Sequence, residues 1–119
     1  MKRDWDIVRK ILMALENIQD TTSVMEPGAV SGYDNEIVSY HMKLLMEAGF
    51  IEGNCRDFTI NAPLHCWATR LTWKGHEFLD RIRSDTVWNR VKGLARERGL
   101  SLSLDVIVMA SKMVIERMF

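Results

Sequence analysis

The side chains with the widest chemical range in this sequence are Cys55, His65 and Cys66. Thiolate and imidazole groups are ligands that zinc accepts, and two strands of one hairpin would bring the three residues together. Structural zinc sites usually show paired short spacings such as C-x-x-C, however, and the chain has none. Two cysteines are also too few for a disulfide scaffold, so in a reducing compartment we expect both as free thiols. The sequence therefore predicts no metal and no cofactor.

Patterns typical of catalysis are missing from the sequence. There is no glycine-rich loop that would cradle a phosphate, no nucleophile elbow, and no concentrated pair of carboxylates outside the predicted exposed helix faces. We therefore predict that the protein is not an enzyme.

A second group of polar side chains, between residues 35 and 43, has the types that read base edges in DNA. In the major groove Asn can bond adenine, Lys can bond guanine, and Glu can accept from cytosine. The base-reading candidates are Asn35, Glu36, Ser39, Tyr40 and Lys43. The candidates for contacts with the DNA backbone are Arg56, Arg70 and Lys74, with Arg81 and Arg83 more distant. A solvated helix face and scattered surface charge explain the same residues, and these alternatives stay open.

The base-reading candidates lie on the outer side of a helix predicted over residues 34–48. At 100° per residue, Val38, His41 and Met42 fall on its inward face. The first residue of this segment is an aspartate, which suits an N-cap, and Gly49 can take the left-handed conformation that ends a helix. Because the histidine points inward, we expect it to be packed and hydrogen-bonded rather than to bind a ligand.

The same periodicity predicts the remaining elements. A helix over 4–19 has Asp4 as its N-cap and carries an apolar stripe of Val8, Ile11, Leu12, Leu15 and Ile18. A loop over 20–33 follows, with at most a short strand near Ala29 and Val30, and strands over 50–60 and 66–71 then form a hairpin with its tip near Pro63. The chain continues with a helix capped by Thr72, a helix over 85–99, and a last helix capped by Ser101 or Ser103. Whether Ser84 marks a kink or a new cap stays open. Segment 20–33 leaves little room for a helix of its own.

The last helix is apolar on more than one face, which favours burial of its second face in a subunit interface. The interface candidates are Val106, Met109, Met113 and Met118, and they predict a homodimer through the C-terminal helices. The four tryptophans, Trp5, Trp67, Trp73 and Trp88, are expected in the core.

The chain has 119 residues, which suits a single domain, with a core over 1–83 and a helical extension over 84–119. No apolar run reaches the length of a membrane span, and the N-terminus lacks the apolar core of a signal peptide. A cytoplasmic protein is the resulting expectation.

The charges balance at sixteen basic and sixteen acidic side chains, which argues mildly against DNA because nucleic-acid binding depends on neutralising phosphates. Their distribution is uneven. Residues 31–55 hold one basic and four acidic side chains, residues 56–83 hold five basic and three acidic, and residues 84–100 hold four basic and two acidic. The predicted base-reading helix is thus acidic, and the basic excess follows it.

Several stretches carry a resemblance to known domains. The helix 34–48 followed by Ala48, Gly49, Phe50 and Ile51 resembles the recognition helix and first wing strand of winged-helix DNA-binding domains, and Leu-Thr-x-x-Gly at 71–75 resembles the end of their wing. The Ser-x-His and Leu-x-x-Ala-Gly patterns in this helix are similar to those of metal-sensor repressors.

With MKRDWDIVRKIL, VSYHMKLLMEAGFIEG, LTWKGHEFLDRIRSDTVWNRVK and SLDVI, the chain is similar over most of its length to a small bacterial and phage-encoded family catalogued as a domain of unknown function.

The resemblance implies an α+β winged-helix fold with a β-hairpin wing and extra C-terminal helices, and a link to prophages or other mobile elements. It implies no particular activity, because domains of this shape serve both as DNA readers and as protein adaptors. The leading expectation is a DNA-binding or transcription-associated factor with helix 34–48 in the major groove of double-stranded DNA. The alternative is a winged-helix module that binds another protein and no DNA.

Overall fold

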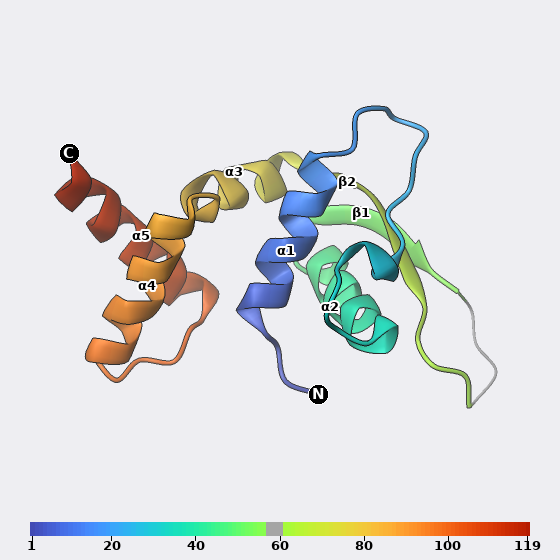
Figure 1. Cartoon of the computed structure of the whole chain (residues 1–119), viewed down its shortest axis with the longest axis horizontal. Coiled ribbons are helices and arrows are strands. Elements are labelled where there is room, and N and C mark those ends of the chain that lie inside the picture. Colours follow the sequence, from blue (N-terminus) through green and yellow to red (C-terminus); the bar gives the residue numbers. More distant parts are fainter. Residues whose placement is uncertain (57–60) are drawn as a thin grey trace. The chain divides into compact units, whose positions relative to one another are not determined.

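A computed structural model describes residues 1–56 and 61–119 (Figure 1). These residues form α1 (Trp5–Glu16), η1 (Pro27–Ala29), α2 (Asn35–Glu47), β1 (Ile51–Cys55), β2 (Cys66–Leu71), α3 (Trp73–Ile82), α4 (Asp85–Glu97) and α5 (Leu104–Met118). The predicted α+β class is confirmed for this part of the chain, with five α-helices, a short 3-10 helix and one antiparallel hairpin. No helix of the described residues is long and apolar enough to cross a membrane.

The chain divides into a first unit, Met1–His76, and a second unit, Glu77–Phe119. The division lies inside α3, whereas the sequence placed the end of the core between residues 83 and 84. The first turn of α3 is bonded to the segment that leaves α2, through Thr72 and Gly75, which explains why it belongs to the first unit.

The N-terminus of α1 is fixed by the predicted cap. The Asp4 carboxylate accepts hydrogen bonds from the amides of Asp6 (2.8 Å) and Ile7 (3.4 Å), two amides that have no partner inside the helix. The predicted apolar stripe is buried from Val8 to Leu15, whereas Ile18, its last member, lies beyond the helix and is half-buried. The helix ends at Glu16, a little earlier than expected.

Helix α2 lies against α1 and the hairpin, and its inward face is the one predicted. Val38 and Met42 are fully buried, and so is His41. The His41 Nε2 atom accepts a hydrogen bond from the Asp4 amide (2.8 Å), so Nδ1 carries the proton that is donated to the Ile37 carbonyl (2.8 Å). The prediction of a packed, hydrogen-bonded histidine is confirmed.

The ends of α2 also lie where the sequence placed them. Asp34 occupies the N-cap position, although its carboxylate makes no capping hydrogen bond to any described residue. At the other end Gly49 has a φ of +78°, a conformation that favours glycine, and the amide of Phe50 turns back to the Leu45 carbonyl at 2.9 Å.

Segment 20–33 reaches the sheet at a different residue from the one expected. Met25 is buried and bridges Ala68 of β2, with both backbone hydrogen bonds formed (2.7 and 3.0 Å). Ala29 lies in η1, so the short strand expected near Ala29 and Val30 is wrong. The pairing occurs earlier because Pro27 begins η1, and a proline lacks the amide that a strand would donate.

Strands β1 and β2 pair antiparallel, with a bulge between Glu52 and Gly53. Their register places Cys55 opposite Cys66, and the two form a disulfide with their Cα atoms 4.0 Å apart. The expectation of free thiols, which rested on a reducing compartment, is therefore wrong in this structure, because the hairpin register places the two cysteines opposite each other. Residues 57–60 of the longer strand expected over 50–60 lie outside the described residues.

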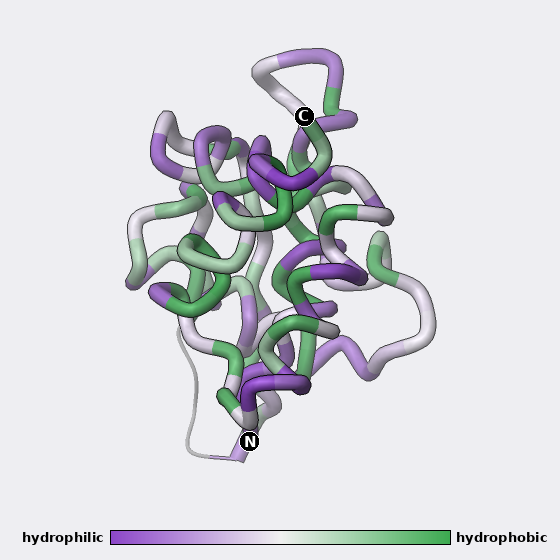
Figure 2. Tube along the Cα trace, turned by 90° about the vertical axis from the view of Figure 1, so that its left-hand side faces the viewer, coloured by the Kyte–Doolittle hydropathy of each residue, from purple (hydrophilic) through white to green (hydrophobic). Residues whose placement is uncertain are grey.

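The second unit pairs α4 with α5 along their apolar sides, and Figure 2 shows the alternation of hydrophobic and hydrophilic residues along the helices. Ser84 accepts from the Val87 amide and Ser103 from the Val106 amide, so each serine is an N-cap. The question left open at Ser84 is thereby answered in favour of a cap.

The tryptophans are less uniform than the sequence suggested. Trp5 and Trp88 are buried and Trp67 is half-buried, but Trp73 is 80% exposed. The expectation of a core position is wrong for Trp73, since the face that the first turn of α3 turns toward α2 is occupied by Gly75 instead.

Candidate functional site

The outer face of α2 is the surface to which the sequence assigned base reading. Asn35, Glu36 and Lys43 are exposed there as expected, and Tyr40 is half-buried. Asp34 and Glu47 are also exposed on or beside this helix. The face therefore presents three carboxylates and one ammonium group to solvent.

Ser39 does not belong to this face. It is fully buried, and its hydroxyl oxygen accepts a hydrogen bond from the Cys66 amide at the start of β2 (3.0 Å). The assignment of Ser39 as a base reader is wrong, because its side chain ties α2 to the sheet and cannot reach a groove.

Arg70, the first backbone-contact candidate on the hairpin, already has an anionic partner. Its Nε and Nη2 atoms donate to the two carboxylate oxygens of Glu52 at 2.8 and 2.7 Å, a bidentate pair across the register of β1 and β2. Its Nη1 atom donates to the Leu71 carbonyl (3.2 Å). The guanidinium charge is therefore balanced on the surface of the hairpin itself.

Lys74 is likewise engaged at the end of α2. Its Nζ atom donates to the Ala48 carbonyl (3.3 Å) and lies 5.2 Å from the centre of the Phe50 ring. A cation at this position interacts favourably with the negative end of the α2 dipole. The Lys74 ammonium group, which was expected to bind a DNA phosphate, therefore stabilises the C-terminal end of α2 in this structure.

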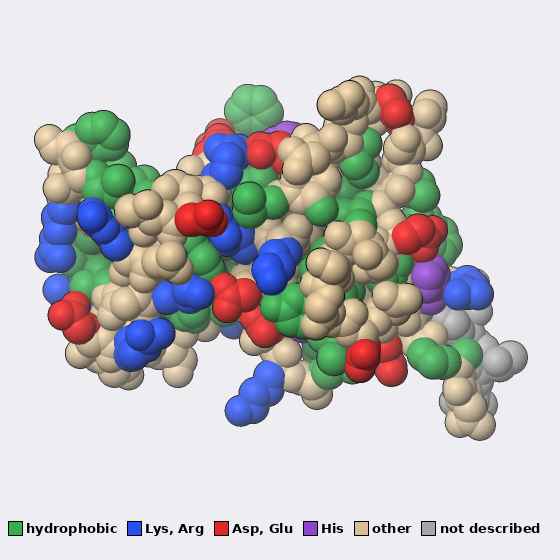
Figure 3. All heavy atoms as spheres, viewed as in Figure 1, with side chains coloured by type: hydrophobic (Ala, Val, Ile, Leu, Met, Phe, Trp, Pro, Cys, Tyr) green, Lys and Arg blue, Asp and Glu red, His purple; other side chains and the backbone are tan. Residues whose placement is uncertain are grey.

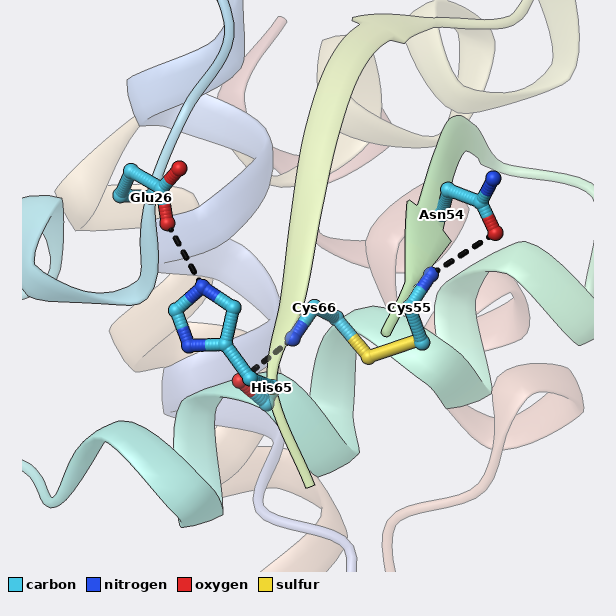
Figure 4. Close-up of a disulfide and its surroundings, with 6 residues drawn as sticks. Glu26, Asn54, Cys55, His65 and Cys66 are labelled. Carbon is cyan, nitrogen blue, oxygen red and sulfur yellow. Dashed lines mark hydrogen bonds and ion pairs between the residues drawn. A yellow bond between two sulfur atoms is a disulfide. The ribbon is translucent and has the colours of Figure 1, made fainter. Parts of the chain in front are cut away.

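Arg56, the remaining candidate of the three, is exposed at the end of β1 and lines a hollow of about 520 Å³. The same hollow is lined by Val24, Glu26, His65 and Trp67. The His65 Nε2 atom lies 2.9 Å from a Glu26 carboxylate oxygen, and Figure 4 shows this pair beside the disulfide. Because both cysteines are bonded to each other, neither thiolate is free to join the histidine as a metal ligand.

One hydroxyl group fixes the segment that follows α2. The Thr72 hydroxyl donates to the Gly49 carbonyl (2.5 Å) and accepts from the Gly75 amide (3.1 Å), while the Thr72 amide donates to the Phe50 carbonyl (3.0 Å). A Cβ atom at Gly75 would overlap the Phe50 carbonyl. Residues 71–75, which carry the Leu-Thr-x-x-Gly pattern, therefore form a junction that sets the orientation of α2 against the hairpin.

Sequence reasoning missed a group of cations near α2. Lys2 and Arg3 precede Asp4, whose amide is bonded to the His41 ring, so the basic N-terminus starts from the side of α2. The Lys10 ammonium donates to the Tyr33 hydroxyl (3.4 Å), just before α2 begins. The sequence shows a basic N-terminus, but only the contact between Asp4 and His41 places this segment beside α2.

The interface candidates of α5 partly converge. Val106, Met109 and Met113 line one hollow with residues of α4, and Met109 is 50% exposed. Met118 is exposed at the end of α5 and does not line this hollow.

Comparison with known proteins gives one family and one curated relative. A family model described as "Hypothetical protein (DUF2513)" matches residues 2–101. A protein of Haemophilus influenzae, described as an uncharacterized protein, is 43% identical over 118 residues, which cover 99% of this chain and 98% of that protein. No solved structure matches the chain. The family match ends before α5, whereas the alignment with the relative extends over it.

Proposed function

This chain belongs to the DUF2513 family, and from its own elements we propose that the first unit is a winged-helix module that binds another protein through the outer face of α2. The order of α1, α2 and the β1–β2 hairpin matches a helix, a recognition helix and a wing. Residue Met25 supports this assignment because it pairs with β2 on the side away from β1, as a first strand would. Element η1 stands in place of a separate second helix.

The charge of the α2 face carries the proposal. Glu36 and Glu47 are exposed on α2, with Asp34 at its N-cap, and Lys43 is the one basic side chain on the helix. A duplex presents a dense row of phosphates, and binding requires basic side chains that replace its counterions. A helix face with a net negative charge opposes that approach, whereas it suits a basic surface of a partner protein.

The neighbouring cations do not reverse this balance. The bidentate pair with Glu52 neutralises Arg70, and Lys74 is held by the carbonyl of Ala48. Releasing Arg70 to a phosphate would leave the Glu52 carboxylate beside the DNA. These contacts support protein binding over a DNA-binding mode in which the β1–β2 hairpin contacts the phosphate backbone of the duplex.

DNA binding is the second candidate, and two observations favour it. Asn35 and Lys43 are exposed on α2, where they could reach base edges, and the basic N-terminus with Lys2 and Arg3 starts beside this helix. In that mode the phosphate contacts come from the N-terminus rather than from the hairpin.

A salt-dependent titration with a fluorescent duplex separates the two candidates. At about 50 mM salt, where electrostatic affinity is strong, we expect no binding by the natural chain. The variant Glu36→Lys/Glu47→Lys should gain non-specific affinity, because it makes the α2 face basic while the fold is kept. Affinity of the natural chain for duplex that falls steeply with salt would overturn the proposal in favour of DNA.

Protein binding is tested by comparing variants in capture from a lysate of the source cells. A specific partner should be retained by the natural chain and by Glu77→Lys, and lost by Glu36→Lys. Glu77 is an exposed acidic residue of α3, so it controls for the change of charge alone. Equal loss with both variants would refute a role for the α2 face.

A further inference from the structure

The second unit carries an apolar groove between α4 and α5. One part is lined by apolar side chains of both helices and of the loop that joins them: Leu94, Ala95, Leu100, Val106, Met109, Ala110 and Met113. Leu100 is 43% exposed and Met109 is 50% exposed. A second hollow of about 480 Å³ shares Leu94 and continues to Val114. The first hollow has a volume of only about 40 Å³, so a side chain enters it when Met109 and Met113 move aside, as flexible methionine side chains can.

Arginines surround this floor. Arg98 lines the first hollow, and Arg90 and Arg117 line the second, where Glu97 is the only acidic lining residue. All three arginines are exposed, and within residues 1–56 and 61–119 none of them has a carboxylate partner. Figure 3 shows Lys and Arg side chains outnumbering Asp and Glu over α4 and α5 on the face in view.

The groove therefore combines exposed apolar surface with unbalanced positive charge. Residues 84–119 hold six basic and four acidic side chains, so the excess is a property of the whole helical pair. Arginine binds carboxylates through two parallel hydrogen bonds, so a molecule bound in the groove would place its acidic side chains along the rim. Apolar side chains at helical spacing would fill its floor.

We propose that the groove between α4 and α5 docks an amphipathic acidic helix of a partner protein. The partner helix inserts apolar residues three to four positions apart against Leu94, Met109 and Met113, and its flanking Asp or Glu side chains bind the rim arginines. This surface lies within the second unit and is independent of the α2 face proposed above.

Charge argues against a second copy of this chain as the occupant. A two-fold symmetric contact would place the same patch of each protomer against itself, so the arginines of one copy would face the arginines of the other. Only Glu97 is available within the groove to balance them. An acidic partner meets no such repulsion.

The test uses the full chain and two synthetic helical peptides of about 16 residues, a length that supports helix formation. Both carry leucine at positions i, i+4 and i+7, and they differ only in having Glu or Lys at the flanking positions. Fluorescence anisotropy should show saturable binding of the Glu peptide and at least tenfold weaker binding of the Lys peptide. Equal affinity for the two peptides, or no binding of the Glu peptide at about 1 mM, would overturn the proposal.

Variants locate the binding. Arg90→Glu/Arg98→Glu should weaken the Glu peptide by about tenfold, because two exposed charge pairs become repulsive. Met109→Lys should weaken both peptides by placing a charge on the apolar floor. Arg96→Glu/Lys112→Glu is the matched control, since both residues are exposed cations of α4 and α5 that do not line the groove. An equal loss of affinity in this control would contradict docking in the groove.

Two further measurements identify other occupants. A dimer mass by light scattering that Met109→Lys converts to a monomer would show that a second copy fills the groove and would overturn the proposal. Binding of the full chain to anionic vesicles that is lost in Arg90→Glu/Arg98→Glu would overturn it in favour of a lipid surface. A monomer that ignores vesicles and prefers the Glu peptide is the expected result.

Discussion

Replacing Thr72 with valine keeps the shape of the side chain and removes its hydroxyl group. Two hydrogen bonds disappear with it, one donated to the Gly49 carbonyl and one accepted from the Gly75 amide. These bonds join the end of α2, the end of β2 and the start of α3. A single oxygen atom therefore connects three elements at this junction.

The expected loss of stability depends on whether each group that loses its partner can form a hydrogen bond with water instead. Gly49 is exposed, so its carbonyl can bond water and its loss costs little. Gly75 is buried, so its amide keeps the full desolvation penalty, on the order of 1–3 kcal/mol. The lost N-cap lies within the same range. We expect a loss of about 2 kcal/mol in the free energy of unfolding.

Urea unfolding followed by tryptophan fluorescence and circular dichroism measures this loss. With a slope of about 1.5 kcal/mol per M, the midpoint of Thr72→Val should fall by roughly 1.3 M. Thr72→Ser retains the hydroxyl and should lie within about 0.5 kcal/mol of the natural chain. If the valine and serine variants unfold at the same urea concentration, the hydroxyl does not hold the junction and the reasoning is refuted.

Two other substitutions, measured by the same unfolding assay, and one chemical test of the disulfide examine the first unit. Gly75→Ala should lose about 3 kcal/mol because its methyl group overlaps the Phe50 carbonyl, and a change below about 1 kcal/mol would contradict that contact. Without reductant, Cys55 and Cys66 should not react with an alkylating reagent in denaturant, and alkylation of both thiols would disprove the disulfide. Its reduction should lower the free energy of unfolding by up to about 3 kcal/mol, because the bond no longer closes a loop in the unfolded chain. His41→Leu should lose about 1–3 kcal/mol by orphaning the amide at the cap of α1, and a variant as stable as the natural chain would show that this bond is unimportant.

Local periodicity predicted the elements that depend on local interactions. The inward face of α2, the cap at Asp4 and the left-handed turn at Gly49 each depend on residues within four positions along the chain. The predicted role of Thr72 as a helix cap also depends on a residue three positions away. Such features can be read from spacing because the backbone geometry of a helix fixes which residues meet.

The errors at Ser39 and at the two cysteines have a different origin, because they depend on residues far apart in the sequence. Ser39 is polar and was assigned to solvent, yet its partner is the amide of Cys66, 27 residues later. The pairing of Arg70 with Glu52 and the disulfide both depend on the register of the hairpin, including its bulge. A long connection with no tight-turn signal leaves that register undetermined by sequence.

The short strand β1 has a consequence for how this protein behaves at high concentration. Strand β2 has neighbours on both sides, β1 and Met25, so within the described residues the outer edge of β1 is the open edge of the sheet. Open edges invite strands of other molecules, and a bulge, a charged residue and a short strand each discourage such pairing. Strand β1 has two of these features, since it is five residues long and exposes Glu52, whereas the extra residue of the bulge, Thr69, belongs to β2. These two features discourage edge-to-edge aggregation of the sheet.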